Sequence, residues 1–418
     1  MSENGDAGEF TLPTGSNILL LRDYSNCEAG RIIELPFAGG KLYTQVERMK
    51  PPSGEGGSFV DVIEEYGEVG GRNERFAMKV YRGVPKDSDK YILTYLMQDD
   101  IYKLIGGAQG HDNVLKYGGS NHENNGTSKD GTAIFLLELV ESRTHSGHIT
   151  KKRGYATEEA LILIRTLADL LNTTDAHQIA HRDIKPQNIL VPADVAGGKI
   201  LRIYPDMAKL FDFDVAWYEK IAAGNGISRK NFAGTMSGTV GFMAPETMHL
   251  SVSTFDPPVD RYALGCVALA TLTNRTTPWE FPKKTNDYKA LRIIFDALKR
   301  NELPSGFGLL DGLPYPDTVK NGVKDMVKGL LAKDPDKRLD AYDTVDKCDE
   351  LLEQVRREDR GSIPIVEISL EDISEITGAT MVAGHVDVNE LNRELFQAGD
   401  LRPTIFLDKD EAKTITGA

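Results

Sequence analysis

Cysteine and long apolar runs are scarce in this sequence. The three cysteines among 418 residues, Cys27, Cys266 and Cys348, lie far apart and form no C-x-x-C pair. This usage excludes a disulfide framework and a zinc knuckle, and it is typical of a reducing compartment. No apolar run approaches the roughly 20 residues of a membrane span, and no N-terminal stretch has the pattern of a secretory signal. We therefore expect a cytoplasmic protein without a membrane partner.

Positive charge is also in short supply. Lys and Arg number 49 against 63 Asp and Glu, which gives a formal net charge of −14. This balance argues against the broad basic surface that nucleic acid or anionic lipid requires, so no nucleic-acid partner is expected. The length of 418 residues exceeds that of one usual hydrophobic core and predicts two lobes.

The first part of the chain has the alternation of β-strands. Strand-like runs at 17–21 and 31–35 predict one hairpin near the N-terminus. Three alternating or β-branched runs within 41–80 are separated by Gly-rich turns, which predicts a β-meander. A helix is expected over 90–105, and the nearly continuous apolar run 133–140 predicts a buried strand.

Helical periodicity dominates after that strand. Thr157 is suited to an N-cap before a helix with an apolar face. Further helices are expected at 259–271, 288–299, 318–331 and 342–356. The fold class is α+β, divided into an N-terminal extension (1–40), a β-rich lobe (41–141), a mostly helical lobe (142–356) and a tail of uncertain order (357–418).

The most informative segment is residues 181–188, HRDIKPQN. Asp183 and Asn188 stand five positions apart with Lys185 between them, so a carboxylate, a cation and a carbonyl oxygen surround one point, as phosphoryl transfer requires. The segment resembles the catalytic loop of eukaryotic-type protein kinases of the serine/threonine branch. The resemblance extends over 41–356 and implies a bilobal fold, with a small antiparallel-sheet N-lobe that carries one helix and a larger, mostly helical C-lobe.

The resemblance implies roles for five polar residues. Asp183 would accept or orient the proton of a substrate hydroxyl, and Lys185 would offset charge on the γ-phosphate of ATP. Asn188 and Asp212 would hold Mg²⁺. Lys79, in the run FAMKV, is similar to the lysine that holds the α- and β-phosphates. The implied partner is a protein substrate with a Ser or Thr hydroxyl.

The expected partner of Lys79 departs from the family pattern. The helix over 90–105 has no glutamate at the usual place. Asp99 or Asp100 would have to serve, and we favour Asp100. Because aspartate is one methylene shorter than glutamate, the helix would have to lie closer to the lysine.

A second departure follows Asp212. The sequence has Asp212-Phe213-Asp214 where the family has D-F-G. An aspartate in place of glycine narrows the available backbone conformations and adds a negative charge near the metal. Two functions therefore stay open: an active serine/threonine kinase with a stiffer switch, and an ATP-binding pseudokinase or scaffold with weak or no transfer. A third is an interaction module whose function lies in the two flanks.

The implied nucleotide pocket combines glycines with apolar and backbone contacts. Glycines within 54–57 would let backbone N–H groups approach the phosphates, although their register against the family pattern is ambiguous. Val62 would cover the adenine, and Glu138 and Val140 would offer backbone groups to its edge. The residues expected to bind ATP are Gly54, Gly56, Gly57, Val62, Ala77, Lys79, Glu138 and Val140.

Residues 238–246, GTVGFMAPE, look like the end of a kinase activation segment. Thr239 would position the substrate and marks the serine/threonine branch. Glu246 would form a structural ion pair with Arg338. Asp260 resembles the residue that braces the backbone of the catalytic loop.

Three hydroxyl residues lie in the segment that could be modified: Ser228, Thr235 and Ser237. A phosphate on any of them would pair with Arg182, so the resemblance implies autophosphorylation. The alternative is that these hydroxyls are ordinary loop residues. The sequence leaves the oligomeric state open.

Overall fold

A computed structural model describes most of the chain between residues 18 and 362. The described residues are 18–19, 32–35, 41–49, 58–65, 74–81, 95–107, 110–121, 133–140, 142–150, 154–196, 199–229, 238–248 and 255–362. The chain divides into two compact units, Met1–Glu358 and Asp359–Ala418, and nearly all of the features below belong to the first. Among the helices of the described part, none is long and apolar enough to cross a membrane.

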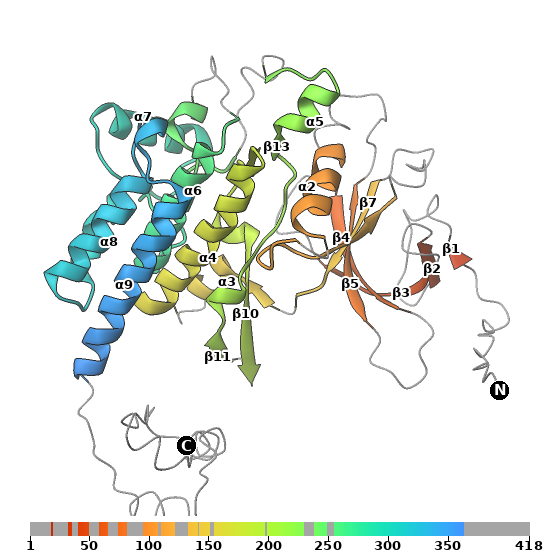
Figure 1. Ribbon diagram of the computed structural model, residues 1–418, viewed down its shortest axis with the longest axis horizontal. Coiled ribbons are helices and arrows are strands. Elements are labelled where there is room, and N and C mark those ends of the chain that lie inside the picture. Colours follow the sequence, from red (N-terminus) through yellow and green to blue (C-terminus); the bar gives the residue numbers. More distant parts are fainter. Residues whose placement is uncertain are drawn as a thin grey trace, which may run out of the picture. The chain divides into compact units, whose positions relative to one another are not determined.

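The N-terminal lobe is built on one sheet (Figure 1). Its strands, in spatial order, are β1 (Ile18–Leu19), β2 (Ile32–Leu35), β3 (Lys41–Met49), β4 (Ser58–Glu65), β5 (Arg75–Tyr81), β7 (Ala133–Glu138) and β6 (Tyr117–Ser120). β3, β4 and β5 confirm the strands expected within 41–80. The two extension strands pair with each other in parallel, Ile18 opposite Ile32, so the hairpin predicted there is wrong. Parallel neighbours need a crossover connection, whereas β2 turns back into β3 as an antiparallel pair.

Strand alternation divides the side chains of β5 between two faces. Met78 and Val80 lie in an apolar cluster with Ile63 of β4. Lys79 and Tyr81 therefore point to the opposite face, where Tyr81 joins the main core. α2 (Met97–Ile105) contributes Tyr102 and other apolar side chains to this same core. The register of one strand thus places its lysine on the side of the sheet that faces the helix.

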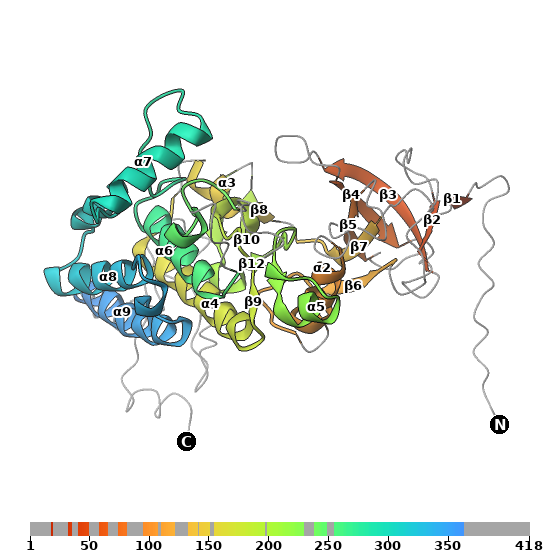
Figure 2. The same cartoon turned by 90° about the horizontal axis from the view of Figure 1, so that it is seen from above.

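The helix expected over 90–105 is described from residue 95. Residues 95–96 form a π-helical turn before α2, and the earlier part of the expected range lies outside the described residues. α2 lies beside the sheet, and α5 (Glu219–Gly224) lies beside α2 (Figures 1 and 2).

The second lobe is mostly helical and confirms the helices predicted there. Its long helices are α4 (Thr157–Ala176), α6 (Pro258–Leu272), α7 (Asp287–Lys299), α8 (Asp317–Leu330) and α9 (Ala341–Ser362). α6 packs against both α4 and α8 and is buried along nearly its whole length (Figure 1). The N-cap of α4 is Ala156 rather than the predicted Thr157, because Glu159 accepts a hydrogen bond from the Ala156 N–H at 3.0 Å and the helix begins one residue earlier.

Short elements complete this lobe around the site. The strands are β8 (Ser142–Thr144), β9 (Ile179–Ala180), β10 (Ile189–Ala196), β11 (Lys199–Ile203), β12 (Lys209–Leu210) and β13 (Trp217–Tyr218). The helical turns are α3 (His145–Thr150), η4 (Pro186–Asn188), η5 (Pro205–Met207), η7 (Pro245–Met248), η8 (Ser305–Gly312) and η9 (Pro335–Lys337). The antiparallel pair β10 and β11 accounts for the long connection between Asn188 and Asp212.

The predicted ion pair between Glu246 and Arg338 is confirmed. Arg338 has a fully buried side chain, and its two terminal nitrogens each lie 2.6 Å from a carboxylate oxygen of Glu246.

We expect Arg338→Ala to lower the free energy of unfolding by about 3–5 kcal/mol, because the Glu246 carboxylate then lies buried without its cation. Denaturant unfolding measures the change. The control is Arg300→Ala, which removes a solvent-exposed pair with Glu302 and should change little. Equal losses in the two variants would contradict the assignment.

A buried histidine gives the lobe an acid sensitivity. His145 of α3 lies 2.7 Å from the Thr271 hydroxyl, and burial, with a smaller contribution from His148, lowers its pKa to about 3. Below about pH 6.5 the unfolded chain binds a proton that the folded one excludes, so the free energy of unfolding falls by up to about 1.4 kcal/mol per pH unit.

We expect His145→Gln to flatten this dependence of the free energy of unfolding on pH between pH 6.5 and 4. The control is His177→Gln, at an exposed histidine, which should leave the dependence unchanged. If the free energy of unfolding changes with pH equally in the wild type and in both variants, His145 is not the source of the acid sensitivity.

Candidate active site

The backbone of the catalytic loop is held by one carboxylate of α6. Asp260 accepts hydrogen bonds from the N–H groups of His181 at 2.6 Å and Arg182 at 2.8 Å, which confirms its predicted bracing role. Burial raises the pKa of Asp260 to about 7, although both N–H groups oppose that shift. Arg182 has a left-handed backbone with φ of 67°, and its guanidinium donates to the Val215 carbonyl at 3.1 Å. The loop is therefore held in a conformation that few non-glycine residues adopt.

Three polar residues form a hydrogen-bonded network around Asp183. The Thr239 hydroxyl donates to one carboxylate oxygen of Asp183 at 2.7 Å, and the Lys185 ammonium donates to the other at 2.7 Å. Lys185 also contacts the Thr239 hydroxyl at 2.7 Å. The Asn188 amide donates to the Asp183 carbonyl at 2.9 Å and to its carboxylate at 3.1 Å. These contacts fix the orientation of the carboxylate, as a general base requires.

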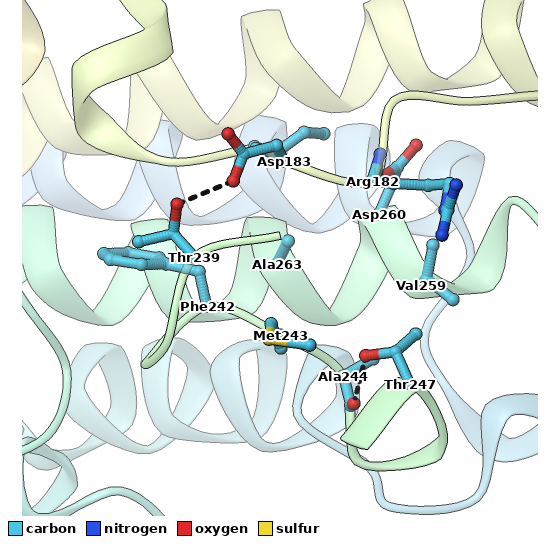
Figure 3. Close-up of a pocket in the computed structure, with 11 residues that line it drawn as sticks. Arg182, Asp183, Thr239, Phe242, Met243, Ala244, Thr247, Val259, Asp260 and Ala263 are labelled. Carbon is cyan, nitrogen blue, oxygen red and sulfur yellow. Dashed lines mark hydrogen bonds between the residues drawn. The ribbon is translucent and has the colours of Figure 1, made fainter. Parts of the chain in front are cut away.

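A small pocket lies beside this carboxylate (Figure 3). Asp183 and Thr239 border it together with the apolar side chains of Phe242 and Met243. Val259 of α6 lines it as well. The carboxylate of Asp183 thus adjoins a surface that offers both hydrogen-bonding and apolar contacts.

Two neighbouring strands bring Asn188 close to Asp212. Asn188 precedes β10 and Asp212 follows β12, and these strands pair with Ile189 opposite Leu210. The Phe211 N–H also donates to the Asn188 carbonyl at 3.1 Å. Because the Asn188 amide nitrogen is used by Asp183, its amide oxygen is the group left to act as a ligand. An amide oxygen and a carboxylate fit Mg²⁺, which completes its coordination with water and phosphate oxygens.

The structure places Lys79 between two carboxylates. Its Nζ atom lies 2.5 Å from an oxygen of Asp212 and 2.5 Å from an oxygen of Asp214. The predicted ion pair with Asp100 is wrong. The counter-charge comes instead from the loop after β12, and it includes the aspartate that replaces the family's glycine.

The rotation of α2 explains why Asp100 does not reach the lysine. Gln98 lies 3.2 Å from the hydroxyl of Tyr81, on the β5 side of the helix, and Asp99 accepts a hydrogen bond from Tyr117. Successive helical residues are about 100° apart, so Asp100 is displaced by about 200° from Gln98. It therefore faces away from the strand that carries Tyr81.

The charges of this cluster depend on one another. Burial opposes the charged form of Lys79, but Asp214, Tyr81 and Asp212 outweigh it and raise the pKa of the lysine well above its ordinary value. The pKa of Asp212 is lowered even though burial opposes this, because Lys79 lies beside it. Burial raises the pKa of Asp214 despite the same positive charge. Lys79 and Asp212 therefore stay ionised at neutral pH.

The aspartate at position 214 is accommodated without backbone strain. Asp212 has the left-handed φ, 71°, whereas Asp214 is not among the described residues with positive φ. The backbone at position 214 therefore has a conformation that aspartate adopts as readily as other residues do, so glycine is not required there. Between the two aspartates, the Phe213 ring packs 4.7 Å from the His181 ring and 5.2 Å from the Tyr102 ring of α2.

The adenine side of the expected pocket is partly described. Gly54, Gly56 and Gly57 lie outside the described residues. Val62 of β4 and Ala77 of β5 are directly opposite each other in the antiparallel ladder, so their side chains share one face of the sheet.

Glu138 ends β7 at the link between the lobes. Its N–H donates to the Lys116 carbonyl at 2.9 Å. Its carboxylate pairs with Lys209 at 2.8 Å. Val140 is half-buried two residues later.

The expected phosphorylation sites are described only in part. Ser228 is exposed, and Thr235 and Ser237 lie outside the described residues. The guanidinium of Arg182, the expected phosphate partner, lies over the Phe255 ring at 4.0 Å.

Sequence reasoning missed Tyr81 and Gln98. The Tyr81 hydroxyl contacts both Gln98 and Asp214. One signal was available, because Tyr81 follows Lys79 by two positions and must share its face of the strand. The role of Gln98 depends on the rotation of α2, which the sequence does not reveal.

Comparisons with known proteins agree with this geometry. A family model described as the protein kinase domain matches residues 54–348. The chain is 30% identical over 213 residues to the probable serine/threonine-protein kinase fhkD of Dictyostelium discoideum, covering 49% of this chain and 25% of that protein. It is 28% identical over 233 residues to ribosomal protein S6 kinase alpha-2 of Homo sapiens, covering 54% and 28%. It is 22% identical over 237 residues to calcium-dependent protein kinase 29 of Arabidopsis thaliana, covering 57% and 37%.

The matched stretches span less than half of the length of each of these relatives. The likeness therefore concerns the kinase domain and not the whole of those proteins. Because the family match covers more than half of this chain, and because its two lobes are the ones that the motifs imply, the chain belongs to the protein kinase family.

Proposed function

We propose that this protein is a serine/threonine kinase that transfers the γ-phosphate of Mg-ATP to a protein hydroxyl. The observation that carries the proposal is the Asp183 carboxylate, held by Lys185, Thr239 and Asn188 at 2.7–3.1 Å. The similarity to fhkD, a probable serine/threonine-protein kinase, supports the serine/threonine class.

In this mechanism each polar residue of the site has a separate task. Asp183 orients the substrate hydroxyl and accepts its proton, and Lys185 offsets negative charge on the transferred phosphoryl group. Lys79 contacts the non-transferred phosphates. Asn188 and Asp212 would hold Mg²⁺, which neutralises phosphate charge when it is bound. Catalysis then rests on positioning and electrostatics.

A protein substrate would bring its hydroxyl to the Asp183 carboxylate, which borders the small pocket that Thr239 also lines.

The alternative is an ATP-binding pseudokinase or scaffold, which rests on Asp214 and on the absence of a glutamate from α2. Two findings favour the active enzyme over this alternative. Asp214 needs no left-handed backbone, and Lys79 has carboxylate partners without the helix. An ATP-dependent rise in melting temperature without any phosphate transfer would identify the pseudokinase.

We expect the purified chain to phosphorylate a generic Ser/Thr substrate in the presence of Mg-ATP. Asp183→Asn should reduce the rate about 100-fold or more, because the loop loses its proton acceptor while the shape of the side chain is retained. Transfer of labelled phosphate measures the rate. The matched control is Asp311→Asn, an exposed aspartate paired with Lys324 on the surface, which should keep full activity. Equal rates for wild type and Asp183→Asn would rule out the assignment.

We also propose autophosphorylation of the activation segment. Ser228 is exposed next to Arg229, which pairs with Glu219 at 2.8 Å and Asp256 at 2.5 Å. A phosphate on Ser228, with a charge of about −2, would compete with Glu219 and Asp256 for the Arg229 guanidinium.

Intact-mass measurement after incubation with Mg-ATP should show added phosphate on the wild type. None should appear on Asp183→Asn or on the triple variant with alanine at Ser228, Thr235 and Ser237. Phosphate that persists in the triple variant would contradict these sites.

A further inference from the structure

Two departures from the family pattern meet at one cation in this structure. We propose that Asp214 is a positioning residue that supplies the carboxylate missing from α2, so that it holds Lys79 while Asp212 is left to the metal. The inference rests on the proposed function, since it concerns the same site. It reverses the expected effect of Asp214, which becomes a requirement for nucleotide binding rather than a defect.

The first step is the demand of Lys79 for a counter-charge. Its side chain is only 12% exposed, and a buried ammonium is costly unless an anion pairs with it. α2 presents Gln98 on the β5 side, with an amide that carries no charge. Within the described part of the chain, the ion pairs of Lys79 are with Asp212 and Asp214.

The second step is the competing demand on Asp212. Its carboxylate is the one that would bind Mg²⁺, and a divalent cation withdraws negative charge from any group that shares the same carboxylate. Asp214 lies at the same 2.5 Å from Lys79 and is not one of the proposed metal ligands. It therefore remains as the dedicated anion of the lysine once the metal is held.

The third step is the connection to α2. The Tyr81 hydroxyl contacts the Asp214 carboxylate and lies 3.2 Å from Gln98, and Lys79 lies 5.0 Å from the centroid of the Tyr81 ring. A phenol carries one proton, so Tyr81 donates either to Gln98 or to Asp214, and the charged acceptor forms the stronger bond. Tyr81 therefore lies between the helix and the Asp214 carboxylate, in the place of a direct contact between the helix and the lysine.

These contacts suggest a reciprocal exchange of residues. Asp214→Gly restores the family's glycine but leaves Lys79 with Asp212 alone, the carboxylate that the metal would share. Gln98→Glu places a carboxylate at the position of α2 that already contacts Tyr81. In the wild-type background this glutamate would be a third anion around one lysine and should weaken binding through like-charge repulsion. In the Asp214→Gly background it should restore binding.

The experiment uses the full chain with four variants and one control. The variants are Asp214→Gly, Asp214→Asn, Gln98→Glu and the double variant Asp214→Gly/Gln98→Glu. The control is Asp311→Gly, the same change at an exposed aspartate whose partner is Lys324. Calorimetry measures the ATP dissociation constant with Mg²⁺ and again with a chelator, and hydrogen exchange reports the protection of α2.

We expect Asp214→Gly and Asp214→Asn to weaken ATP binding roughly 30-fold or more with Mg²⁺, as for a hydrogen-bonded charge pair that loses one partner. The loss should be smaller with the chelator, because Asp212 then still pairs with Lys79. The ATP dissociation constant of the double variant should return to within about 3-fold of the wild-type value. Protection of α2 from hydrogen exchange should fall in Asp214→Gly and recover in the double variant. The Asp311→Gly control should bind ATP as the wild type does.

Three results would overturn the inference. Wild-type affinity in Asp214→Gly would mean that the lysine needs no such anion. A loss that Gln98→Glu does not recover would assign Asp214 a merely structural role. A larger loss with the chelator than with Mg²⁺ would contradict the division of the two aspartates between the metal and the lysine.

The ATP affinities also separate this inference from the proposed function. If the wild type binds ATP but transfers no phosphate, the proposed function fails, and the affinities of the variants still decide the role of Asp214. A wild type that binds no ATP would overturn both.

Discussion

The ammonium of Lys79 joins the two halves of the site. It extends from β5 of the sheet and ends between two carboxylates that belong to the loop after β12. A cation buried at this junction cannot be moved without separating charges, so the lobes are held in register at this point. The orientation of the Asp212 carboxylate depends on this ammonium, and so does the position of Asp214 beside the Tyr81 hydroxyl.

A second connection runs through rings and backbone bonds. Asp260 of α6 holds His181, whose ring packs against Phe213, and Phe213 packs in turn against Tyr102 of α2. The core of the larger lobe is thereby linked to the helix of the smaller one. Ionic and apolar contacts act on the same short loop, because Phe213 stands between the two aspartates.

The sequence was most informative where function requires several residue types at a fixed spacing. The spacing of Asp183, Lys185 and Asn188 identified the catalytic loop, and helical periodicity located the elements of the larger lobe. The partner of Lys79 could not be found in this way, because it depends on the rotation of α2 about its axis. Asp100, two positions after Gln98, points to another side of the helix, and only the packing of Tyr102 and its neighbours fixes that rotation. The parallel pairing of Ile18 with Ile32 is a tertiary contact that local alternation does not contain.

The extension strands also bear on where the domain can be cut. The family match begins at residue 54, whereas β1, β2 and β3 lie before it and continue the same sheet as β4 and β5. An expression fragment trimmed to the match would strip three strands and bare the hydrogen-bonding edge of β4. An uncovered edge invites other chains to add to it, so such a fragment would be prone to aggregate. A fragment that keeps this sheet intact should therefore begin before Ile18.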